Sequence, residues 1–236
     1  MNGFPPSGGR SVKAATLRFA VLLLAAALVH ISARAVEPVA SAKAKIKISY
    51  LPTSDFVRMV SLGYRELAAD LYWFKAVQYY GGYRLEQNDL VFFTHLVDLI
   101  TDLDPRFLGA YKLGAIVIAQ DLDNFSEAIR LLNKGLRHNP DDYWLTFEMG
   151  FLHYMGGRDY KAAEKYFRVA ATLPASDGRA ARFAAEAAAR GGNIEASIML
   201  WRELAAHSDN RYLRELAEKY IRKLEARRAG RGEGSV

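Results

Sequence analysis

From Asp55 onward, apolar residues recur at intervals of three and four, and short breaks rich in Gly, Asn, Asp and Pro separate the runs. That interval is the period of an α-helix with one buried face. The same region lacks alternation of apolar and polar residues of any length, which would mark a strand. The pattern therefore predicts an all-α body.

Positions of the same character recur in this body every 34 residues. They are small residues, larger residues four positions later, and boundary prolines: Ala128, Ala162 and Ala196; Leu132, Tyr166 and Leu200; Pro140 and Pro174. Gly150 and Ala184 share the spacing, and Gly114 stands 36 residues before Gly150, as a two-residue insertion in the 120–124 loop would produce. A fixed period of this length indicates one supersecondary unit that is stacked repeatedly.

Each period has the features of a two-helix unit. Small residues let the paired helices approach closely, and the larger residues fill the space between units. The stretches 139–142 and 173–177 combine Pro with Asp or Ser, which ends one helix and caps the next. The double glycines at 81–82, 156–157 and 191–192 are predicted to form the turns inside the units.

These features resemble the tetratricopeptide repeat family over about 104–210. Two units match its pattern of small residues, Ala, an aromatic or Leu, and a closing Pro, and a third lacks the Pro: Leu113-Gly114, Ala128, Leu132, Pro140; Met149-Gly150, Ala162, Tyr166, Pro174; Phe183-Ala184, Ala196, Leu200. The resemblance implies a right-handed superhelical solenoid of about four helix pairs. Segments 66–80 and 90–103 would form a divergent first pair, and 210–228 a C-terminal capping helix.

The N-terminus has the layout of an export signal. Residues 19–29 are an uncharged apolar run that follows Arg10, Lys13 and Arg18, and small residues at 33 and 35 allow cleavage after Ala35. The 15 residues between Arg18 and Arg34 fall short of the roughly 20 that span a bilayer, although flanking arginines lengthen the span. A cleaved signal and a retained anchor helix both remain open, and an organellar transit peptide fits less well.

The sequence thus divides into four predicted parts. Residues 1–35 are a signal peptide or membrane anchor, 36–55 a linker, 56–228 the helical repeat domain and 229–236 a flexible tail. The linker assignment rests on a short alternation at Ile46, Ile48 and Tyr50, for which the sequence offers no partner strand.

The net charge of +6 points toward nucleic acid until its distribution is considered. Residues 1–50 carry +6 and residues 219–236 carry +4, whereas 51–218 has 19 basic and 23 acidic residues, a net of −4. A mildly acidic body is a poor phosphate binder, so no nucleic-acid partner is expected. The absence of cysteine excludes disulfides, thiolate zinc sites, Cys nucleophiles and covalent haem attachment.

No motif indicates catalysis. The five histidines are scattered without metal-ligand spacing, the glycine pairs lack a following Lys-Ser/Thr, and no nucleophile elbow occurs. The acid pairs Asp102/Asp104 and Asp141/Asp142 lie beside prolines, where helix capping explains them. We therefore expect no catalytic residues, no metal and no cofactor, hence a protein that is not an enzyme.

A binding groove is predicted on the first helices of the units, which line the concave side of such a solenoid. Its expected members follow a helical stripe: Leu108, Tyr111, Trp144, Phe147, Phe151 and Tyr154. The next unit offers small residues at the equivalent places, Gly178, Ala181, Ala185 and Ala188, so an apolar pocket for a partner helix or extended peptide is expected. The alternative is that the chain's own linker or C-terminal helix fills this groove. The carboxylate clamp known in the family uses Lys, Asn and Arg, which these positions lack.

A second contact surface is predicted at Tyr72, Trp73 and Phe74, within a segment, 64–93, that holds nine aromatic residues. The stretch 71–74 is apolar all round, which is typical of a helix buried on both sides or docked on another surface. Core packing is the simpler explanation, and a membrane or subunit contact is the other.

Together these features predict a non-enzymatic scaffold of a bacterial cell envelope that binds a protein partner in its groove during complex assembly. The protein would be anchored in the inner membrane facing the periplasm through its N-terminal segment, or periplasmic after signal cleavage. One alternative is a structural subunit that self-associates as a homo-oligomer through the aromatic first unit. A weaker one is an accessory domain that binds a small apolar ligand.

Overall fold

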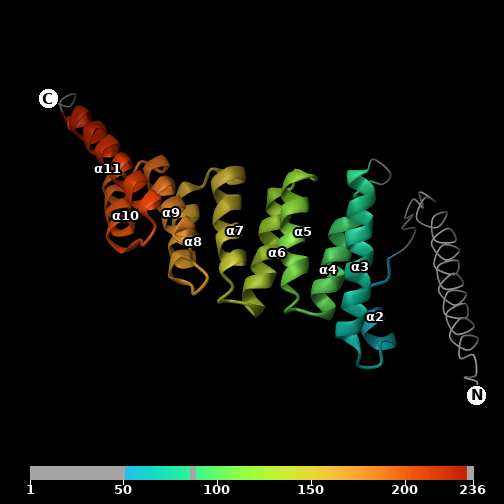
Figure 1. The fold of residues 1–236 in the computed structure, drawn as a ribbon. Coiled ribbons are helices and arrows are strands. Elements are labelled where there is room, and N and C mark those ends of the chain that lie inside the picture. The colour runs from blue at the N-terminus through green and yellow to red at the C-terminus, as the bar shows by residue number, and fades with distance from the viewer. Residues whose placement is uncertain (1–50, 86–88, 233–236) are drawn as a thin grey trace, which may run out of the picture. The chain divides into compact units, whose positions relative to one another are not determined.

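The computed structural model of the chain describes residues 51–85 and 89–232 (Figure 1), all within one compact unit, Lys47–Val236. Over these residues the regular structure is helical, without a strand. The predicted all-α body is confirmed. The signal or anchor segment 1–35, most of the linker and the last residues of the tail lie outside the described residues.

The helices pack as successive pairs (Figure 1). The pairs are α3 (Arg65–Arg84) with α4 (Phe93–Leu103), α5 (Leu108–Gln120) with α6 (Phe125–His138), α7 (Tyr143–Leu152) with α8 (Tyr160–Thr172), and α9 (Arg179–Arg190) with α10 (Ile194–His207). The second helix of each pair packs on the first helix of the next, and α11 (Arg211–Gly232) packs on α10. This succession of contacts is that of a helical solenoid.

Helical structure extends beyond the predicted repeat domain at both ends. The short helix α2 (Ser54–Val60) begins inside the predicted linker, because the Thr53 side chain caps it by accepting a hydrogen bond from the Phe56 amide at 3.3 Å. At the other end α11 continues past residue 228 to Gly232. No helix among residues 51–85 and 89–232 is both long and apolar enough to cross a bilayer.

Capping side chains set the starts of four helices. In each case a side-chain oxygen accepts a hydrogen bond from the amide three residues on: Asn124 from Glu127 at 3.1 Å, Asp142 from Leu145 at 2.8 Å, Asp159 from Ala162 at 3.0 Å, and Asn193 from Ala196 at 3.1 Å. The predicted capping role of Asp142 is confirmed. Asp102 instead lies inside α4, where it pairs with a lysine of α6.

Two of the three predicted glycine turns are present. Gly156 and Gly157 close the connection from α7 to α8, within a π-helical turn, η1 (His153–Gly157), and Gly192 adopts a φ of +87° between α9 and α10. The prediction for Gly81 and Gly82 was wrong, because α3 runs through both residues to Arg84. Glycine inside a helix costs about 1 kcal/mol relative to alanine, which the packing of Tyr79 and Tyr83 on either side outweighs.

The repeating small residues lie where helices approach most closely. A Cβ atom at Gly114 would lie 2.6 Å from Val97 Cγ1 of α4 and 2.8 Å from Leu131 Cδ2 of α6. One at Gly150 would lie 2.8 Å from the ring of Phe167 on α8. Such distances are too short for a methyl group, so the sequence interpretation of these glycines is confirmed.

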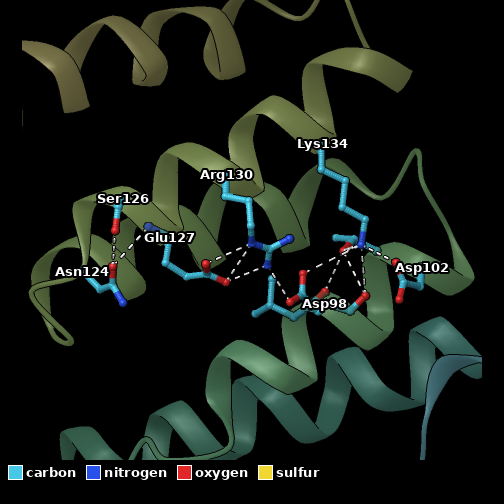
Figure 2. A network of polar contacts seen from close by, with 9 residues as sticks. Asp98, Asp102, Asn124, Ser126, Glu127, Arg130 and Lys134 are labelled. Carbon is cyan, nitrogen blue, oxygen red and sulfur yellow. Dashed lines mark hydrogen bonds and ion pairs between the residues drawn. The ribbon is translucent and has the colours of Figure 1, made fainter.

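A polar network joins α4 to α6 (Figure 2). Arg130 Nη2 donates to Asp98 Oδ2 and to Glu127 Oε1, both at 2.6 Å, and Lys134 Nζ donates to Thr101 Oγ1 at 2.8 Å. The hydrogen bond from Arg130 is the main cause that lowers the pKa of Glu127. Because these side chains bridge two adjacent helix pairs, they fix how the second helices of those pairs lie against each other.

Replacing Lys134 by methionine is expected to lower the free energy of unfolding by about 1–3 kcal/mol, the cost of leaving buried polar partners unpaired. The side chain of Lys134 is only 14% exposed, and its loss removes the charged hydrogen bonds to Thr101 and Asp102. Urea unfolding followed by circular dichroism measures the change. The matched control is Arg211→Met, whose ion pair with Glu215 is exposed and is expected to contribute less than about 1 kcal/mol. Equal losses in the two variants would contradict a role for the network.

Candidate partner-binding surface

The exposed face of α7 carries a stripe of large side chains. Trp144 and Met155 are 44% and 55% exposed, and Glu148 and Phe151 between them are half-buried. These positions are three or four residues apart, so they share one face of the helix as it continues into η1. Trp144 is the only tryptophan exposed by more than a third among the described residues.

Phe183 of α9 packs at the centre of an aromatic cluster behind this stripe. Its ring centroid lies 5.2 to 6.1 Å from the centroids of four rings: Phe147, Phe151, Tyr154 and Phe167. Edge-to-face and tilted arrangements dominate, which is the geometry that aromatic rings prefer. Phe183 therefore fills the space beside Phe147, Phe151 and Tyr154, next to the small residues at which the sequence predicts an apolar pocket.

Three arginines of α9 lie over these rings. The guanidinium carbon to ring centroid distances are 5.2 Å for Arg179 over Trp144, 4.8 Å for Arg182 over Phe183, and 5.0 Å for Arg190 over Tyr154. A cation above the face of an aromatic ring is attracted by the ring quadrupole. The arrangement combines Trp, Tyr, Phe and Arg, the residues that most often dominate protein interfaces. We call Trp144, Phe151, Arg179, Arg182 and Arg190 the Arg–aromatic surface.

Nearby carboxylates orient this surface. Arg179 Nη2 donates to Asp177 Oδ2 at 2.9 Å, and Arg182 lies 4.0 Å from Glu186. Burial would raise the pKa of Asp177, but hydrogen bonds from the Arg179 amide and guanidinium outweigh it, so the pKa is lowered. Burial alone raises the pKa of Glu148, which stands beside Trp144 and Phe151 on α7.

The sequence did not identify the arginines of α9. The predicted stripe on α9 was obtained by adding 34 to the residue numbers of the stripe on α7. It included Ala185 and Ala188, which are fully buried. The accessible side chains lie one residue further on, which is a rotation of about 100° around the helix. The signal was present, since Arg179, Arg182 and Arg190 follow helical spacing on one face.

The predicted groove residues separate into two groups. Trp144 is exposed, and Leu108 and Phe151 are half-buried and reach the surface. The others are core residues, with exposed fractions of 0% for Tyr111, 6% for Phe147 and 7% for Tyr154. The predicted stripe therefore included residues that pack between successive helices as well as residues that face solvent.

The second predicted surface also divides. Tyr72 and Trp73 are half-buried against the core, and the Trp73 ring lies 5.4 Å from that of Phe107. Phe74 is 63% exposed on the opposite face of α3. Core packing therefore explains Tyr72 and Trp73 but does not explain Phe74.

A hollow with a volume of about 640 Å³ is bordered by α8, α9 and α10, with Leu173, Leu204 and His207 among its lining residues. Gly178 and Ala181, two of the small residues at which the sequence predicts a pocket, also line it. Among residues 51–85 and 89–232, no group of three His, Asp or Glu side chains is placed to hold a metal ion.

Comparison with known proteins gives one short similarity. No protein-family model matches the chain. The chain is 32% identical over 71 residues to photosystem I assembly protein Ycf3 of Sorghum bicolor. The matched stretch covers 29% of this chain and 41% of that protein, so the chain spans less than half of the relative's length.

Proposed function

We propose that this chain is a tetratricopeptide-type scaffold that binds a partner protein and has no enzymatic activity of its own. Three findings support the proposal: the 34-residue period, the succession of helix pairs, and the similarity to a protein named for photosystem I assembly. A right-handed superhelix is part of the same proposal, since the tetratricopeptide resemblance implies it. A repeat solenoid presents extended surfaces rather than a catalytic cleft, which suits recruitment of a partner during assembly.

The observation that carries the proposal is the exposure of Trp144. A tryptophan that is 44% exposed keeps a large apolar area in water. The guanidinium carbon of Arg179 lies 5.2 Å from the centroid of the Trp144 ring and orients the ring from one side. Because the ring is already oriented, a partner that covers it gains the burial energy with little loss of side-chain entropy. We therefore assign partner binding to the Arg–aromatic surface rather than to the deeper aromatic cluster.

For the location of the protein we propose the bacterial cell envelope. The proposal rests on the sequence of residues 1–35 alone, read as an inner-membrane anchor or as a signal that is removed. The mass of the N-terminus of the purified protein distinguishes the two, since cleavage after Ala35 leaves Val36 as the first residue.

Crosslinking in cells followed by quantitative recovery of the bound partner tests the binding surface. In the variant that combines Trp144→Ala with Phe151→Ala, recovery is expected to fall at least about tenfold, because two central aromatic contacts are lost. The matched control is Met199→Ala, which removes a side chain 59% exposed on α10. Equal recovery by the native protein and a correctly folded double variant would refute the assignment.

A further inference from the structure

Helix α3 is apolar on two opposite faces. One face packs in the core through Ala69, Ala76 and Tyr79. On the other, Leu67, Leu71 and Phe74 form a stripe at helical spacing and are 56%, 60% and 63% exposed. Asp70 and Lys75 flank this stripe and are exposed as well. Large apolar side chains gathered on an exposed face commonly mark a contact with a protein or a membrane.

The exposed stripe is accompanied by apolar side chains in the preceding segment. Phe56 and Met59 of α2 are 52% and 69% exposed, and Leu62 in the connection to α3 is 84% exposed with a φ of +50°. A left-handed backbone at a leucine is unfavourable, and here it accompanies a side chain that is almost entirely in water. We call these three residues and the α3 stripe the α2–α3 apolar face.

The last helix of the solenoid shows how an end of this protein faces water. Its exposed positions carry charges, including Arg211, Glu215, Glu218 and Arg222, with side chains 61% to 85% exposed. A polar outer face is what a terminal helix of a soluble solenoid requires. The α2–α3 end differs, because large apolar side chains are exposed there among the charged ones.

The charge around the α2–α3 apolar face favours an anionic occupant. Among the described residues, 51–85 hold four basic and three acidic side chains, a net of +1, whereas 89–218 hold 15 basic and 19 acidic ones, a net of −4. Arg58 and Arg65 belong to the positive part, and their side chains are 48% and 53% exposed. Large apolar side chains flanked by exposed arginines are typical of segments that lie in the headgroup region of a bilayer.

The position of the face in the sequence points to the same occupant. Only 24 residues separate the apolar run ending at Val29 from Ser54, the first residue of α2. That length reaches at most about 85 Å, so a membrane-held run keeps α2 near the same bilayer. We propose that the α2–α3 apolar face rests on the surface of an anionic lipid bilayer, with Leu67, Leu71 and Phe74 in contact with the acyl-chain boundary. This inference rests on the proposed membrane location and is independent of the Arg–aromatic surface.

The absence of cysteine from the sequence makes the test direct, because one introduced cysteine carries the only label. The full chain with Leu71→Cys is labelled with the fluorophore NBD and reconstituted into vesicles of phosphatidylcholine with 30% phosphatidylglycerol. The control is Met199→Cys on α10, since residues 71 and 199 are almost equally exposed, 60% and 59%. Doxyl-labelled lipid is expected to quench position 71 at least about threefold more than position 199, and aqueous iodide is expected to do the reverse.

Three outcomes would overturn the proposal. Equal iodide quenching at both positions would show that the face is in water. Protection of position 71 from both quenchers, with disulfide crosslinking between copies of Leu71→Cys, would assign the face to a second copy of the chain. The same protection without such a crosslink would assign it to another protein segment. Partner recovery through Trp144 is measured separately, so the failure of one proposal leaves the other standing.

A charge variant gives a second readout on the same labelled protein. Replacing both Arg58 and Arg65 by glutamate in the Leu71→Cys background is expected to halve the doxyl quenching, or more, on anionic vesicles. Both arginines are exposed and form ion pairs with Asp55 and Glu66 close by in sequence. Because Arg58 Nη2 also donates to the Asp102 carbonyl oxygen of α4 at 3.3 Å, circular dichroism of the variant checks that the fold is retained. Quenching that is unaffected by this variant would contradict the part assigned to charge.

Discussion

Replacing Trp201 by alanine is expected to lower the free energy of unfolding by about 3–5 kcal/mol, the range for removing a fully buried large aromatic side chain. Trp201 of α10 is completely buried, and its ring stacks on Tyr220 of α11 with centroids 4.8 Å apart and planes 8° from parallel. The remaining buried residues of α11 are small or few, chiefly Ala217 and Leu224. The Trp201 ring is therefore the largest buried side chain against which the last helix packs.

The expected loss has a local component that a second measurement detects. In Trp201→Ala, trypsin is expected to cut the Arg- and Lys-rich α11 several-fold faster than in the native protein, because local opening of the helix needs less free energy. The control is Trp144→Ala, which removes the same side chain from a position 44% exposed and is expected to cost less than about 1 kcal/mol. Equal losses of stability for the two tryptophans, or unchanged cleavage of α11, would contradict this account.

Much of the fold could be predicted because the repeat imposes the same steric requirement several times. Gly114 and Gly150 mark close helix approaches, and the 34-residue interval carries that requirement from one pair to the next. Asp142 and Asn193 begin helices through bonds to amides three residues on, which is a local effect that short sequence windows contain. The prediction of a turn at Gly81 and Gly82 was wrong because tertiary packing of α3 overrides their low helix propensity.

The candidate surface was harder to predict than the fold. Helical periodicity identifies a face only to within one residue, and a step of one residue separates buried Phe147 from half-buried Glu148. Whether a ring such as Phe183 fills a gap depends on its rotamer and on three-dimensional neighbours, which no spacing rule contains. The arginines of α9 were seen in the sequence only as charge, and their contacts with rings of α7 required the structure.

The two proposed surfaces differ in the kind of residue that exposes apolar area. At Trp144 the exposed ring is held by a cation and lies beside other charged groups, which suits a protein partner that contributes its own polar atoms. On α3 the exposed apolar stripe is Leu67, Leu71 and Phe74, whose side chains have no polar atoms to direct a partner. A bilayer imposes no such directional requirement, so the difference in composition matches the difference in proposed occupant.

The packing of Gly150 against Phe167 gives the second large effect. Phe167 is completely buried, and Phe167→Ala is expected to lower the free energy of unfolding by about 3–5 kcal/mol because it opens a cavity among Phe147, Tyr154 and Phe183. Gly150→Ala is expected to cost about 1–3 kcal/mol, since its Cβ would lie 2.8 Å from the Phe167 ring. Urea unfolding of each variant measures both values.

The double variant decides whether these two effects share one cause. If the cost of Gly150→Ala arises from the Phe167 ring, that cost disappears once the ring is gone, so the two losses sum to more than the loss in the double variant by about 1–3 kcal/mol. Gly157→Ala is the control for a glycine change, because a Cβ there meets only Asp159 Cβ at 3.9 Å. Strict additivity would mean that the backbone of Gly150 is constrained by something other than Phe167. A coupling of the expected size would instead show that this glycine is selected by helix contact, the requirement from which the 34-residue period was first inferred.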